Sequence, residues 1–257
     1  MLAKDTAIIK ILDELNVVVM GLDRRDYQHF YDALGFWDKG YRFKPAYKIG
    51  RWDGKIRFFD KNGKTSINML PFIVPDLQAK GYKLELIDNR SPAEVMVPEI
   101  DEEFLSDIDL GDGPVILGDH QVKGINAITQ NAGGILLAAT GAGKSYICAS
   151  LIKLYNDNLN YRCMVIVPNK DLINQTNKDI NDMGIESGRY FGDVKEPNMK
   201  NVVSTWQSLQ NNPALMAQFD VIIVDECHGT KGNILRQMIL EYGTTAKLRI
   251  GLTRNIT

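Results

Sequence analysis

Residues 138–145 (AATGAGKS) combine small residues, a lysine and a hydroxyl at a spacing that can bind phosphate. They follow an apolar run at 135–137 and precede a helical pattern at 146–155. A strand that turns through glycines into a helix aims backbone N–H groups and the positive end of the helix dipole at one anion. Lys144 adds a charge for the outer phosphates, and the Ser145 hydroxyl can ligate Mg²⁺. The segment therefore predicts a site for a nucleoside triphosphate and Mg²⁺.

Two acidic residues, Asp225 and Glu226, follow a second apolar run, 81 residues after Lys144. We expect Asp225 to hold the same Mg²⁺, directly or through water, and Glu226 to act as the general base that orients or deprotonates a water. Lys144, Asp225 and Glu226 are thus the candidate catalytic residues. The structural alternatives are a glycine-rich turn that holds no ligand and a solvated strand end.

The pattern after residue 114 alternates strands with helices. Strands are expected at 134–139, 163–167, 201–204, 220–225 and 248–252, and helices at 120–131, 143–156, 170–183 and 232–242. This alternation predicts an α/β fold, a parallel sheet covered on both faces. Both motifs then lie at the carboxyl ends of strands, where such sheets bind ligands.

Residues 1–90 are expected to form a small α+β module. Helical spacing occurs at 26–34 and 73–80, and strand patterns occur at 41–47, 55–60 and 83–87. An acidic stretch with proline and glycine follows, and we interpret residues 91–113 as a linker. No apolar run reaches the ~18 residues of a membrane span, which predicts no membrane partner and a cytoplasmic location.

Charge is concentrated in one block of this module although the net charge of the chain is −2. Residues 39–64 hold nine basic side chains and two acidic ones. Aromatic residues alternate with the basic ones, which suits phosphate neutralisation together with base stacking. The alternative is a solvated basic face over an ordinary aromatic core.

The phosphate-binding segment resembles superfamily-2 helicases. Ala138 replaces the glycine of the general phosphate-loop pattern, but Ala-x-Thr-Gly-x-Gly-Lys-Ser matches this family, and Asp225-Glu226-Cys227-His228 resembles its acidic tetrad. The resemblance implies a RecA-like domain at 114–257, three layers around a parallel sheet. It also implies an ATP-binding loop made of Thr140, Gly141, Ala142, Gly143, Lys144 and Ser145.

Further segments resemble the same helicases in the expected order. Gln121 resembles the glutamine that recognises adenine, and Pro168, Asn169 and Thr205 resemble residues that touch the nucleic-acid backbone. A buried Trp206 or a helix-capping Thr205 is the structural alternative. The resemblance also implies that His228 and Thr253 couple hydrolysis to movement, although Arg254 and Asn255 depart from the family pattern at this last motif.

Residues 41–57 resemble the corresponding stretch of recombination helicases from tailed phages, in which a small α/β domain precedes the motor. The resemblance implies backbone-directed DNA contacts, in branched, single-stranded or double-stranded DNA. The candidate contact residues are Arg42, Lys44, Lys48, Arg51, Lys55 and Arg57.

The function expected from these residues is that of an ATP-dependent DNA helicase or translocase that acts on branched DNA. The chain would be a monomer, located in the host cytoplasm if phage-encoded, and would hold the first RecA-like domain without the second. One alternative is a non-catalytic clamp or regulator that binds nucleotide and DNA. The others are an RNA helicase and a nuclease-coupled translocase.

Overall fold

The computed structural model describes residues 6–88, 90, 95–139, 141–227 and 233–254. The chain divides into two compact units, residues 1–92 and 93–257, close to the boundary expected from the change of charge. Each unit has its own sheet and its own core. Within the described segments, no helix is both long and apolar enough to span a membrane.

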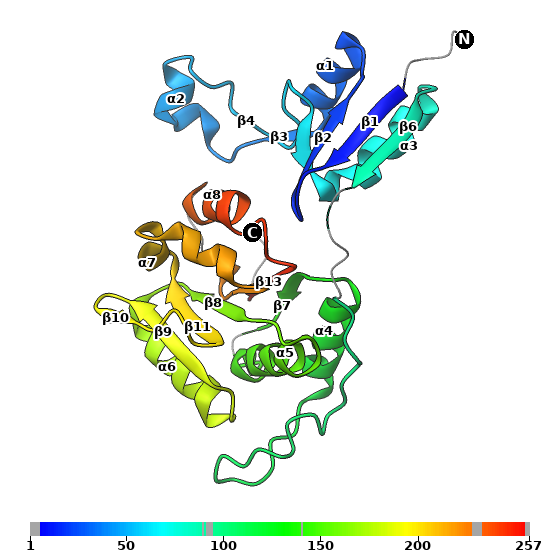
Figure 1. Ribbon diagram of the computed structural model, residues 1–257. Helices are drawn as coiled ribbons and strands as arrows, with labels where there is room; N and C mark the ends of the chain where they lie inside the picture. The colour runs from blue at the N-terminus through cyan, green and yellow to red at the C-terminus, as the bar shows by residue number, and fades with distance from the viewer. Residues whose placement is uncertain (1–5, 89, 91–94, 140, 228–232, 255–257) are drawn as a thin grey trace. The chain divides into compact units, whose positions relative to one another are not determined.

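The first unit contains a four-stranded sheet with two helices packed on one face (Figure 1). The strand order of the sheet is β5 (Lys64–Ser66), β2 (Asn16–Met20), β1 (Thr6–Ile11) and β6 (Lys83–Asp88). The two helices are α1 (Arg24–Ala33) and α3 (Leu70–Ala79), and the 3₁₀ turn η2 (Ile67–Met69) precedes α3. The predicted helices and β6 are confirmed. Strands β1 and β2 are not predicted, because their apolar runs lack a clear alternation and are separated by a short acidic turn.

Residues 35–57 form an arm of the first unit, seen around the label α2 in Figure 1. The arm consists of β3 (Gly35–Trp37), the 3₁₀ turn η1 (Tyr41–Phe43), α2 (Pro45–Lys48) and β4 (Lys55–Arg57). The predicted strand at 41–47 is therefore wrong. Gly40 adopts a left-handed φ of 68°, and Pro45 opens a helical turn, so the backbone coils where the sequence suggested extension.

The second unit contains a seven-stranded sheet between two layers of helices. The strand order is β10 (Val194–Lys195), β9 (Ser187–Phe191), β11 (Asn201–Thr205), β8 (Cys163–Val167), β12 (Val221–Val224), β13 (Leu248–Thr253) and β7 (Gly134–Leu137). All neighbours are parallel except β10 and β9. The predicted three-layer parallel-sheet fold is confirmed.

Alternate residues of the central strands enter two separate cores. One face packs against α4 (Asp119–Gln130), α5 (Lys144–Leu159) and α6 (Lys170–Asp182), and the other against α7 (Trp206–Gln210), the 3₁₀ helix η3 (Pro213–Gln218) and α8 (Asn233–Tyr242). On β8, for example, Val165 enters the first core and Met164 the second. Burial on both faces explains why these strands are continuous apolar runs.

The acidic stretch differs from the expected linker over its described part. Ile100 and Leu105 are buried in the core of the second unit, together with Val115 and Leu117 just after the stretch. The side chain of Asn126 on α4 bonds both the N–H and the carbonyl of Ile100, at 3.0 and 2.9 Å. Apolar residues spaced between the acids anchor the stretch, so residues 95–113 belong to the second unit.

Asp26 links helix α1 to Lys80 and Tyr82, which precede β6, in the first unit. It is buried on α1, accepts a 2.8 Å hydrogen bond from the Tyr82 hydroxyl and pairs with Lys80 at 3.0 Å. We expect Asp26→Asn to destabilise this unit by about 2 kcal/mol, because the buried network loses its negative charge and one of its two acceptor oxygens. Hydrogen exchange of the β1 and β6 amides measures this stability. Asp32→Asn, on the exposed side of the same helix, should change it by less than about 0.5 kcal/mol.

Candidate functional site

The carboxyl ends of four adjacent strands bring the predicted site residues to one edge of the second sheet. Strands β8, β12, β13 and β7 lie side by side and parallel, so the segments that follow them emerge together. The Ala138 N–H donates to the Thr253 carbonyl at 2.7 Å, and the Asp225 N–H donates to the Ile166 carbonyl at 2.9 Å. These backbone bonds fix the phosphate loop and the acidic motif to their neighbouring strands.

The phosphate loop depends on two glycines with left-handed backbone. Gly141 has a φ of 82° and Gly143 a φ of 70°, which side chains rarely permit. A Cβ atom on Gly143 would lie 2.2 Å from Nε2 of Gln121, so that position also lacks space for a side chain. Helix α5 begins immediately afterwards at Lys144, which turns its first N–H groups toward the loop. Thr140 lies outside the described residues.

Lys144 and the acidic pair meet at this edge, as the sequence predicted. Nζ of Lys144 forms an ion pair with Oε1 of Glu226 and lies 3.8 Å from Oδ1 of Asp225. The three side chains are 18–25% exposed, so the cluster is partly shielded but open to a ligand. Glu226 has a left-handed φ of 49°. This backbone conformation costs free energy for a residue with a side chain, and such strained residues cluster at functional sites.

Ser145 and Gln121 hold protein partners rather than pointing freely into the loop. The Ser145 hydroxyl donates to Oδ2 of Asp179 on α6 at 2.8 Å. Gln121 is buried, accepts a 2.8 Å bond from the Gly118 N–H and donates to the Ala142 carbonyl at 2.9 Å. Its adenine-binding role stays a prediction, while its visible role is to hold the phosphate loop.

Asp179 is a site residue that was not predicted. It is half-buried next to Ile180, which belongs to the stripe of α6 that faces the core, and a charged residue there needs a polar partner. An acid next to that stripe was the available sequence signal. The Ser145 partner could not be foreseen, because it comes from a helix 34 positions earlier in the chain.

The predicted nucleic-acid residues of the second unit lie in different environments. Thr205 is fully buried and caps α7, accepting a 3.2 Å bond from the Ser208 N–H, so the structure gives it the capping role and not a surface contact. Asn169 is exposed but also acts as a cap, for α6. A small hollow lined by Pro168, Trp206, Asp225 and Glu226, among others, joins this region to the acidic pair.

The remaining motif residues are packed near the same edge. Thr253 is buried at the end of β13, and a Cβ atom on Gly251 would lie 2.8 Å from Sγ of Cys227. Burial raises the pKa of the Cys227 thiol, and it raises that of the core residue Cys148 to about 12, so both are neutral near pH 7. His228 and Asn255 lie outside the described residues.

The basic residues of the arm lie over aromatic rings instead of sharing a separate face. The ammonium of Lys55 lies 5.1 Å from the Trp37 ring centroid, and that of Lys44 lies 5.7 Å from the Trp52 centroid. The Arg57 guanidinium pairs with Asp53 and holds the pKa of that carboxyl well below its usual range. Arg42 covers Tyr41 at 5.6 Å, and in the described structure neither Lys48 nor Arg51 forms an ion pair.

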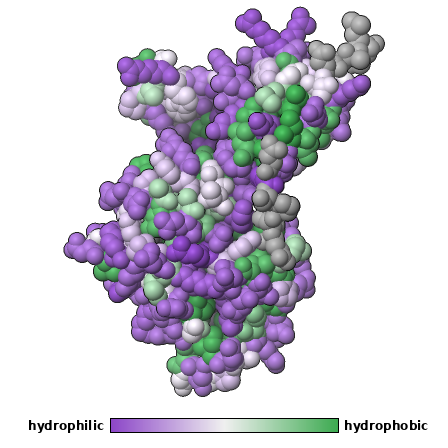
Figure 2. Space-filling view, viewed as in Figure 1, coloured by the Kyte–Doolittle hydropathy of each residue, from purple (hydrophilic) through white to green (hydrophobic). Residues whose placement is uncertain are grey.

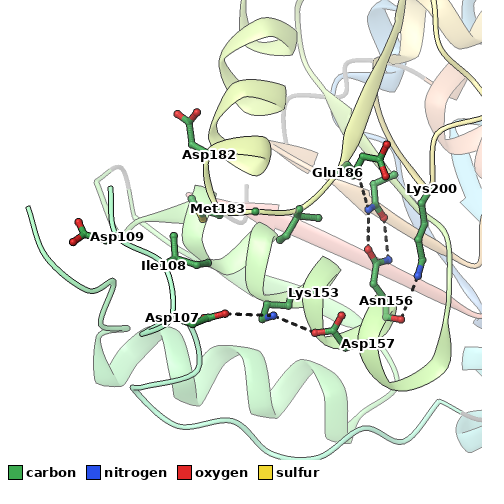
Figure 3. A pocket seen from close by; sticks show the side chains of 13 residues that line it. Asp107, Ile108, Asp109, Lys153, Asn156, Asp157, Asp182, Met183, Glu186 and Lys200 are labelled. Atoms are coloured by element: carbon green, nitrogen blue, oxygen red, sulfur yellow. Dashed lines mark hydrogen bonds and ion pairs between the residues drawn. The ribbon is translucent and has the colours of Figure 1, made fainter. Parts of the chain in front are cut away.

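A separate cavity of about 460 Å³ contains none of the predicted nucleotide residues (Figure 3). It lies between residues 107–109, the carboxyl-terminal half of α5, the end of α6 and the start of β11. Lys153 pairs there with Asp157 at 3.2 Å, and the amides of Asn156 and Asn201 bond each other. The cavity therefore belongs to the opposite end of the strands from the phosphate loop.

Two family models match the chain, one for each unit. The family described as "Type III restriction enzyme, res subunit" matches residues 114–254, and "DNA helicase UvsW, N-terminal" matches residues 9–88. The first match spans the phosphate loop, the acidic pair and β13, and the second spans the arm and all of the first sheet except the start of β1.

A curated relative and two solved structures are similar over nearly the whole chain. The ATP-dependent DNA helicase uvsW of Enterobacteria phage T4 is 29% identical over 239 residues, which cover 86% of this chain and 48% of the relative. The chain thus spans about half the length of that relative. Two crystal structures of the T4 UvsW helicase are 23% identical and cover 97% of this chain, with TM-scores of 0.78 and 0.79; the match covers 92% and 53% of those chains.

Family membership follows from the extent of these matches together with the geometry of the phosphate loop. The chain belongs to the family of the type III restriction enzyme res subunit and is a UvsW-like member of the superfamily-2 helicases.

Proposed function

We propose that this protein is an ATP-dependent DNA motor that acts on branched DNA, in which the second unit binds and hydrolyses ATP and the first unit holds DNA. The observation that carries the proposal is the meeting of Lys144 with Asp225 and Glu226 beside a glycine-formed loop. A lone basic residue at a helix start would bind an anion, but the adjacent carboxylates add the groups that phosphoryl transfer to water requires. The similarity to the T4 helicase supports the same activity.

The residues at this edge suit a magnesium ion. Ser145 and Asp225 offer a hydroxyl and a carboxylate, and Mg²⁺ in NTP sites takes one or two such ligands with phosphates and water. When bound, the ion would neutralise charge on the phosphates. Ser145 would have to exchange its bond to Asp179 for the ion.

Each remaining residue has a role that follows from its position. Lys144 would neutralise the outer phosphates, and Glu226 would orient the attacking water and accept its proton. Because Lys144 and Glu226 pair with each other, ATP must separate them, which frees the lysine for phosphate and the carboxylate for water. Gln121 would keep Gly143 in its left-handed conformation while this exchange occurs.

We expect Glu226→Gln to bind ATP more tightly and to hydrolyse it far more slowly. The substitution removes the ionic partner of Lys144 and a negative charge beside the phosphates, an effect of ~1 kcal/mol or about fivefold in affinity. Titration with a fluorescent ATP analogue and Mg²⁺ measures the affinity. Glu241→Gln, an exposed glutamate on α8, is the matched control and should change nothing. Unchanged or weaker binding by Glu226→Gln would contradict the proposed exchange.

The rate of ATP hydrolysis, measured with and without branched DNA, distinguishes a motor from a clamp that only binds. The measurement uses the longest natural protein that carries this sequence. DNA should stimulate turnover, and Lys144→Ala should lower it by about 10²- to 10³-fold, as loss of a preorganised charge-stabilising donor does. Lys153→Ala, on the same helix but at the opposite end of the strands, should retain activity. DNA binding without turnover in any form would favour the clamp, and stimulation by RNA alone would favour an RNA motor.

The basic arm predicts a salt-dependent DNA contact. We expect replacement of Arg42, Lys48, Arg51 and Lys55 by alanine to weaken binding and to flatten the log–log salt dependence by up to about 0.9 for each lost phosphate contact. Fluorescence anisotropy at several salt concentrations measures both quantities. An equal loss of charge at the exposed residues Lys83, Lys123, Lys178 and Lys195 is the control. If both quadruple variants behave alike, the arm is only a charged scaffold.

A further inference from the structure

The arm is held together by aromatic contacts although it has no buried core. Between residues 35 and 53, no side chain is buried. The Trp37 and Tyr41 rings stack at 4.9 Å, Tyr41 and Tyr47 meet edge to face at 4.8 Å, and the Trp52 indole donates to the Lys55 carbonyl at 2.8 Å. These four rings are the scaffold of the arm.

Phe43 lies outside this scaffold. Its side chain is 80% exposed, more than any other large apolar side chain in the described parts of the chain. Within those parts, the Phe43 ring forms none of the aromatic or cation–ring contacts of the arm. A second apolar residue of the arm, Ile49 on the turn after α2, is 61% exposed. Burying such a ring contributes about 1.5–3 kcal/mol, which the isolated protein forgoes.

Basic residues flank the exposed ring in the sequence. Arg42 and Lys44 are its neighbours in sequence, and the exposed Lys48 and Arg51 follow within the same arm. Figure 2 shows hydrophilic and hydrophobic residues side by side over this part of the first unit. A flat apolar surface in a basic stretch of chain complements a polyanion that presents flat apolar faces, which is the chemistry of an unpaired nucleotide.

We propose that Phe43 stacks on an unpaired base at a DNA branch point while the cations of the arm hold the flanking phosphates; this rests on the proposed function of the arm. Bases within an intact duplex are already stacked on both faces, so Phe43 gains nothing there. A branch point supplies bases with a free face. Phe43 offers no donor or acceptor to a base edge, so it recognises the absence of pairing rather than a sequence.

The two parts of the arm therefore have separate tasks. The cations contribute affinity for any DNA, and their contribution falls with salt. Phe43 contributes the preference for branched over linear DNA, and a stacking contact between neutral rings depends little on salt. This division allows each part to be removed without the other.

The test compares a three-way junction that carries an unpaired 2-aminopurine at its branch point with a linear duplex of equal length. The variants of the full chain are Phe43→Ala, Phe43→Trp and Phe72→Ala, the last removing a phenylalanine that is 65% exposed on α3, outside the arm. We expect Phe43→Ala to lose about 5- to 100-fold in junction affinity, with duplex affinity within twofold of wild type and an unchanged salt slope. Phe43→Trp should restore junction affinity, and Phe72→Ala should match wild type.

The 2-aminopurine signal reports stacking directly. Its fluorescence should change when wild type or Phe43→Trp binds and should not change with Phe43→Ala. Equal losses on junction and duplex, or no loss on either, would overturn the role of Phe43 while DNA binding by the cations remains. Absence of DNA binding by wild type would overturn the proposed function as well. If Phe43 is needed for binding to phosphatidylglycerol vesicles and gives no preference for the junction, its partner is a lipid surface and the proposed base stacking is overturned.

Discussion

The ion pair between Lys144 and Glu226 is the contact on which the functional geometry depends. It joins residues 82 positions apart, one at the start of a helix and one at the end of a strand. Such a pair forms only because β7 and β12 belong to one parallel sheet and end at the same edge. The left-handed glycines of the loop then direct α5 away from that edge, with its first residue facing the acids.

The conformation around this pair is that of a loop held by protein groups. Glu226 satisfies Lys144, Asp179 satisfies Ser145, and Gln121 holds the loop carbonyls. The first two contacts give polar groups partners that a nucleotide with its metal ion could replace, whereas the Gln121 contact would persist. Binding would therefore exchange one set of interactions for another, and its affinity would be the difference between them.

The elements of the second unit could be predicted well because each central strand is buried on both faces and has to be a continuous apolar run, as at 163–167 and 221–224. The arm could not be predicted in the same way. Tyr41, Phe43 and Tyr47 alternate with basic residues in a pattern typical of a strand, but Pro45 and Gly40 impose turns. Likewise, the acids at 101–109 suggested a linker because the anchoring role of Ile100 and Leu105 is visible only once α4 and α5 are in place.

The sequence by itself determined the chemistry, namely which residues can bind phosphate, ligate a metal ion or carry positive charge. It also determined the central strands and helices of the second unit. Local spacing contains that information, because motifs and periodic burial are properties of neighbouring residues. Only the tertiary structure decided the partners. The pairing of Ser145 with Asp179 and the exposed position of Phe43 arise from contacts between distant segments, or from their absence, and no local pattern encodes them.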